Sequence, residues 1–104
     1  MAERLVLPDS WSDLRGGGVE EEGQRSVIQR ELRAEVAAGH PLAGVSGEVI
    51  ARSTAADDVL ILLKGGRWAL VHLTWRCAPE APPWPFVEFY DSVQALERAL
   101  PVDN

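Results

Sequence analysis

The sequence predicts an α+β domain: an antiparallel β-meander of three to four strands with one long N-terminal helix and one short C-terminal helix. A helical period of apolar residues covers residues 20–38, strand-forming residues then dominate up to residue 90, and a second helical period follows. Short connections separate the strands and favour antiparallel pairing, because a parallel crossover needs a dozen or more residues. We expect residues 1–18 to form a partly irregular N-terminal segment and residues 19–104 to form one α+β domain.

The long helix is predicted over residues 20–38, where Ile28, Leu32 and Val36 recur every four residues and form one apolar stripe. Gly39 followed by Pro41 is a stop signal, since glycine adopts the left-handed cap and proline cannot continue the helix.

The segment before this helix is harder to assign. Residues 5–7 are apolar and form either a short strand or a docked hydrophobic hook. Asp9 and Ser10 are suited to cap a turn over residues 11–14, and the three glycines at 16–18 then break regular structure.

Four strands are predicted, over residues 45–53, 58–64, 68–76 and 86–90. Five consecutive aliphatic residues in the second strand predict burial on both of its faces. Four prolines between residues 76 and 85 predict an extended, stiff connector. In the last helix Asp91 is the expected N-cap, and the apolar face carries Val93, Leu96 and Leu100.

The second and third strands are expected to form a hairpin whose two-residue turn is Gly65-Gly66, since glycine supplies the positive φ angles that such turns need. This register places Val59 opposite His72 and Asp57 opposite Thr74, all on one face of the sheet. His72, Asp57 and Thr74 would then form a polar corner at the end of the hairpin distant from the turn.

His72 and Asp57 are the best catalytic candidates, with His72 as general base and Asp57 as the carboxylate that orients it. The alternative, which we favour, is a half-buried histidine that satisfies the end of a strand, because no nucleophile-bearing motif accompanies the pair. Further candidates for contact with a ligand or partner are Asp58, Thr74, Trp84 and His40. Trp84 lies between two prolines and either presents its ring to a partner or covers an apolar sheet face.

Composition excludes several classes of function. The 104 residues include 10 Lys and Arg against 16 Asp and Glu, a formal net charge of −6, which disfavours binding to DNA or RNA. The longest apolar run, residues 59–63, is too short to cross a membrane. Cys77 is alone and the histidines show no metal-ligand spacing, so we expect no disulfide, no metal and no cofactor. A free thiol and the lack of an export signal favour the cytoplasm.

Four short blocks carry a resemblance: GHPL at 39–42, DDVL at 57–60, VHLTW at 71–75 and WP at 84–85. Together they resemble a group of short bacterial proteins of unassigned function, over residues 30–90. The resemblance implies a bacterial, stand-alone domain and supplies no activity or catalytic residue.

Taken together, these observations predict a non-enzymatic protein-interaction or accessory domain that binds a protein partner or forms a homodimer. The alternative is a small-ligand-binding protein or weak hydrolase with a site at His72 and Asp57.

Overall fold

The computed structural model describes residues 5–54, 56–81 and 84–100 of the chain. Seven elements follow one another: β1 (Trp11–Asp13), α1 (Val19–Glu35), β2 (Gly47–Ser53), β3 (Asp58–Leu63), β4 (Trp68–His72), β5 (Phe86–Tyr90) and α2 (Val93–Ala99). The strands form one sheet in the order β1-β2-β3-β4-β5, and every neighbouring pair is antiparallel. The predicted α+β class and antiparallel meander are confirmed, with five strands in place of three to four.

The additional strand is β1, which falls where the sequence favours a turn. A turn precedes it, since the Trp11 amide donates to the Pro8 carbonyl at 3.0 Å, and the chain then pairs with β2 through Trp11 opposite Ser53. Three residues are too few to display an alternating pattern. The strand therefore exists because the edge of β2 is available to it, which local sequence does not reveal.

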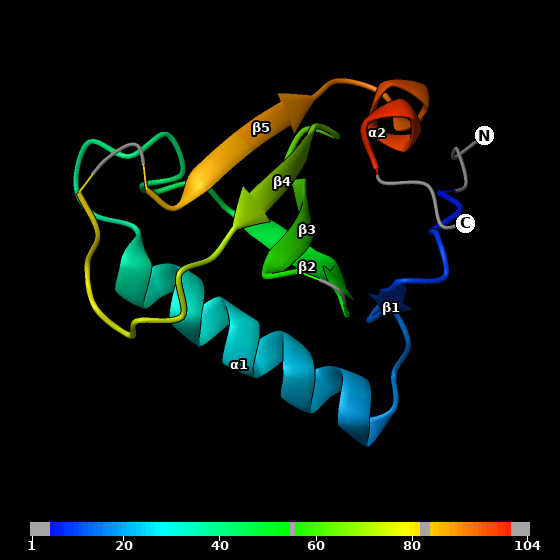
Figure 1. Cartoon of the computed structure of the whole chain (residues 1–104), viewed down its shortest axis with the longest axis horizontal. Helices are drawn as coiled ribbons and strands as arrows, with labels where there is room; N and C mark the ends of the chain where they lie inside the picture. The colour runs from blue at the N-terminus through cyan, green and yellow to red at the C-terminus, as the bar shows by residue number, and fades with distance from the viewer. Residues whose placement is uncertain (1–4, 55, 82–83, 101–104) are drawn as a thin grey trace.

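The two helices cover opposite faces of the sheet (Figure 1). The core beneath α1 contains Ile28 of the helix and apolar side chains of three central strands: Val49, Val59, Ile61, Leu63, Ala69 and Val71. The core beneath α2 contains Leu96 and residues from the other face, including Leu60 and Trp68. Leu5 is 3% exposed in this second core, so the N-terminal apolar segment docks as a hook.

The observed helix boundaries differ from the predicted ones. Helix α1 ends at Glu35, three residues before the predicted end, because Val36 adopts an extended conformation with φ −78° and ψ 109°. Gly39 does have the expected left-handed φ of +90°, but it lies in the turn that follows the helix. The N-cap of α2 is Ser92 and not Asp91; its hydroxyl accepts a hydrogen bond from the Ala95 amide at 3.1 Å.

The β3–β4 hairpin differs from the prediction by one residue. Asp58 lies opposite His72 and Val59 lies opposite Val71. The Gly66 amide donates to the Leu63 carbonyl at 3.0 Å, and Leu63 in turn donates to Arg67, so the loop contains three residues. Lys64 thus joins the two glycines in the loop. One additional loop residue shifts every cross-strand pair, and the predicted register is wrong for this reason.

Candidate functional site

The polar corner predicted from the sequence is replaced by a different pair. His72 Nδ1 lies 2.8 Å from Asp58 Oδ1, and the two residues face each other across β3 and β4. Asp57 is not the partner of His72: its carbonyl accepts from the Leu73 amide, and it lines a separate surface hollow with Arg52 and Thr54. The predicted His72–Asp57 association is therefore wrong, and the one-residue change in register is the physical reason.

The His72–Asp58 pair is open to solvent, with 48% of the histidine side chain and 25% of the aspartate side chain exposed. Water screens such a pair, so we expect the coupling energy between Asp58→Ala and His72→Ala to be within about 1 kcal/mol at neutral pH. A double-mutant cycle of urea unfolding measures it. A coupling energy of several kcal/mol would show that the pair is a buried structural unit and would contradict its assignment to the surface.

An exposed aromatic pair lies beside this ion pair. Trp84 and Phe86 pack edge to face, with ring centroids 4.5 Å apart and an interplanar angle of 76°. Trp84 is 39% exposed and Phe86 is 48% exposed, and neither belongs to a core cluster. Phe86 is the β5 partner of His72 and therefore lies on the same face of the sheet. We call Trp84, Phe86, His72 and Asp58 the aromatic patch.

His40 holds the segment that carries the two aromatic residues of the patch. It is 4% exposed, and its Nδ1 accepts from the Leu42 amide at 3.0 Å, which leaves the ring proton on Nε2. Nε2 then donates to the Pro85 carbonyl at 2.7 Å, between the two aromatic residues. Both ring nitrogens are thus occupied within the protein. His40, a candidate for ligand contact in the sequence, positions Trp84 and Phe86 and does not face a ligand.

Two buried glutamates of α1 form a polar cluster that sequence reasoning missed. Glu35 is completely buried and Glu31 is 5% exposed. The carboxylate of Glu35 accepts from the amides of Thr74 and Trp75, both at 2.8 Å, and Glu31 accepts from the amide of Cys77 at 2.9 Å. Both glutamates therefore bind the backbone of the loop that follows β4.

This loop needs such support because of its conformation. Trp75 and Cys77 have left-handed φ angles of +59° and +57°. Side chains other than glycine adopt this conformation at a cost of about 1–2 kcal/mol per residue. The hydrogen bonds to Glu31 and Glu35 offset that cost. Thr74 thus serves the fold through its backbone amide, and the partner of His72 is Asp58. A sequence signal existed, because Glu31 and Glu35 lie three and seven residues after Ile28, on the same helix face.

The two glutamates differ in acidity. Burial raises the pKa of Glu35, and its hydrogen bond with Glu31 raises it further, while the amides of Thr74 and Trp75 act in the opposite direction. The hydrogen bond from Glu35 lowers the pKa of Glu31, burial acts in the opposite direction, and the amide of Cys77 lowers the pKa further. Glu31 also accepts from the Cys77 thiol at 3.2 Å and so raises the pKa of that thiol. Cys77 is exposed, and its raised pKa disfavours the reactive thiolate form.

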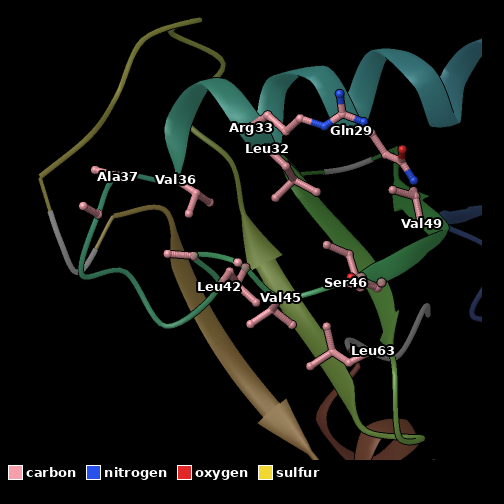
Figure 2. Close-up of a pocket in the computed structure, with 15 residues that line it drawn as sticks. Gln29, Leu32, Arg33, Val36, Ala37, Leu42, Val45, Ser46, Val49 and Leu63 are labelled. Atoms are coloured by element: carbon pink, nitrogen blue, oxygen red, sulfur yellow. The ribbon is translucent and has the colours of Figure 1, made fainter.

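A groove lies between α1, the loop that follows it, and strands β2 and β3. Its volume is about 540 Å³. Leu32 and Val36 line it on the helix side, and Leu42, Val45 and Val49 face them from the loop and the sheet (Figure 2). Arg33 and Gln29 lie along its helical rim, where Arg33 extends along α1 toward Gln29 in this view.

Within the described ranges, no three His, Cys, Asp or Glu side chains come close enough together to hold a metal ion. Neither of the two helices described combines the length and apolar content that a membrane crossing requires. No protein-family model, no curated protein and no solved structure matches this chain. The resemblance to short bacterial proteins noted in the sequence therefore stays a prediction.

Proposed function

We propose that this protein is a non-enzymatic interaction domain that binds a basic segment of a partner protein through the aromatic patch. The observation that carries the proposal is the exposed Trp84–Phe86 pair beside the His72–Asp58 ion pair. Two large aromatic side chains in contact on a surface expose apolar area that a partner would remove from water. Aromatic residues are also the side chains most enriched at the centres of protein interfaces.

Charge identifies the kind of partner. The three stretches that form and surround the patch, residues 56–63, 68–75 and 84–90, contain Asp57, Asp58 and Glu88 and contain no Lys or Arg. The whole chain carries a formal charge of −6. An arginine or lysine of the partner would stack on the face of Trp84 and approach the Asp58 carboxylate, two interactions that reinforce each other. Negative charge over the wider surface would accelerate the encounter.

A random peptide library displayed on phage tests this proposal. Selection against the protein is expected to enrich peptides that contain Arg or Lys next to apolar residues. Trp84→Ala and Phe86→Ala should each weaken binding of a synthetic peptide from this pool at least tenfold, as expected for interface centres. Asp58→Asn should weaken it several-fold, with the greater loss at low salt.

Val19→Ala is the matched control, because Val19 is an apolar side chain with 88% exposure that lies outside the patch. It should leave peptide binding unchanged. Failure to enrich any peptide, enrichment of acidic peptides, or equal binding by the Trp84→Ala protein would overturn the proposal. Fluorescence polarisation with a labelled peptide provides the affinities.

A further inference from the structure

We infer that the groove beside α1 is a binding site for a small amphipathic carboxylate, an aliphatic chain that ends in a carboxylate group. The inference is independent of the proposed function, because no member of the aromatic patch lines the groove. Its volume of about 540 Å³ falls within the range of roughly 300–1,000 Å³ that is typical of small-molecule pockets.

The loop that follows α1 forms one wall of the groove. After Glu35 the chain leaves the helical path and forms a turn-rich loop in which Gly39 and Gly44 have φ angles of +90° and +74°. Leu32 and Val36 remain only partly buried, and Val45 is 46% exposed on the opposite wall.

The floor of the groove is apolar and rigid. Val49, Ile61 and Leu63 are buried residues of β2 and β3, so they are fixed by the core beneath α1. Gly47 also lines the groove, and it packs closely against the floor. A Cβ atom at this position would lie only 2.7 Å from Ile61 Cγ2, so a larger residue would not fit without displacing Ile61. An aliphatic chain lying on this floor would remove from water the apolar side chains that the fold leaves partly uncovered.

Arg33 determines the polarity of the ligand. It is the one charged residue among those that line the groove, and no carboxylate of the described ranges forms an ion pair with it. In a chain with net charge −6, an unpaired guanidinium at the rim of an apolar groove favours an anion. A guanidinium binds a carboxylate through two parallel hydrogen bonds, and the amide of Gln29 lies beside it as an additional donor (Figure 2).

Three probes with straight chains of ten carbons and different head groups test the inference: decanoate, decanol and decyltrimethylammonium. NMR titration of the ¹⁵N-labelled protein should show decanoate shifting amide signals of the groove, including those of Val36, Val45 and Ser46. Its dissociation constant should be about tenfold lower than that of decanol, and decyltrimethylammonium should bind most weakly. Equal affinity for all three probes, or no saturable shift with decanoate, would overturn the inference.

Two variants and one control variant show which residues of the protein contact the probes. Arg33→Gln should raise the dissociation constant of decanoate to that of decanol and leave decanol unchanged. Arg30→Gln, an arginine on the same helix that does not line the groove, is the matched control and should change neither. Ala37→Trp should fill the groove and abolish binding of decanoate and decanol alike, while an unchanged unfolding transition shows that the protein is folded.

The titration also distinguishes the groove from the aromatic patch. Trp84→Ala should leave decanoate binding intact; shifts confined to Trp84 and Phe86 would place the ligand on the aromatic patch and overturn the inference. Analytical ultracentrifugation tests whether a second copy occupies the groove. A dimer that becomes monomeric in Val45→Asp would assign the groove to self-association and would equally overturn the inference.

Discussion

Glu35→Ala is expected to lower the free energy of unfolding by about 2–4 kcal/mol, because two backbone amides lose their acceptor at once. The carboxylate holds the amides of Thr74 and Trp75 at 2.8 Å each, and alanine offers no replacement. The loss is increased by the left-handed conformation of Trp75, which the hydrogen bond supports. Urea unfolding followed by tryptophan fluorescence measures the change.

Glu35→Gln and Glu22→Ala are the controls. The glutamine retains one acceptor oxygen, so its cost should be smaller than that of the alanine. Glu22 is an exposed glutamate of the first turn of α1, and its replacement should change the free energy of unfolding by no more than about 0.5 kcal/mol. Equal stability of the Glu35→Ala and Glu22→Ala proteins would contradict the role assigned to the buried carboxylate.

The same glutamate pair predicts a pH dependence. Because the folded pKa of Glu35 is raised, its stabilising contribution is fully present below the ordinary pKa of 4.5 and is lost as the pH rises through the folded value. The pKa of Glu31 is lowered, so its contribution is present above 4.5 and is lost as the pH falls through the folded value. Stability from the pair should therefore be greatest near pH 4.5, and Glu35→Gln should remove the decline on the alkaline side. Urea unfolding of both proteins at a series of pH values measures the difference.

His40→Ala is expected to have the second large effect, a loss of about 2–4 kcal/mol in the free energy of unfolding. The imidazole is buried and bridges Leu42 to Pro85, so truncation breaks two hydrogen bonds and leaves a cavity. Because Pro85 lies between Trp84 and Phe86, the variant should also bind the selected basic peptides less tightly at temperatures where it remains folded. Urea unfolding and fluorescence polarisation measure the two effects.

The other histidine provides the control. His72→Ala removes an imidazole that is half exposed, so its cost in stability should be within about 1 kcal/mol. Similar losses of stability for the two alanine variants would show that the difference in burial between His40 and His72 does not hold in solution.

The candidate site could be predicted only in part. Trp84 and His72 are recognisable from residue type and position, and both belong to the aromatic patch. The sequence predicts a strand that contains Phe86 but does not predict that its side chain is exposed. The side chain is exposed because α2 covers a different part of the same face of the sheet. His40 could not be distinguished from a ligand contact, because its two partners are Leu42, two residues away, and Pro85, 45 residues away. Glu31 and Glu35 carry charges that a sequence pattern assigns to solvent, and only the amides of the β4–β5 loop make their burial favourable.

The sequence by itself determined the α+β class, the long amphipathic helix, the central hairpin strands and the C-terminal helix, because apolar period and cap residues act over a few neighbouring positions. Tertiary structure decided β1 and the hairpin register. Each depends on a partner distant in sequence or on one residue of a loop: the edge of β2 accepts Trp11–Asp13, and Lys64 joins the turn and brings Asp58 opposite His72. Pairing across a sheet is decided by the total of many weak contacts, and a single loop residue changes all of them together.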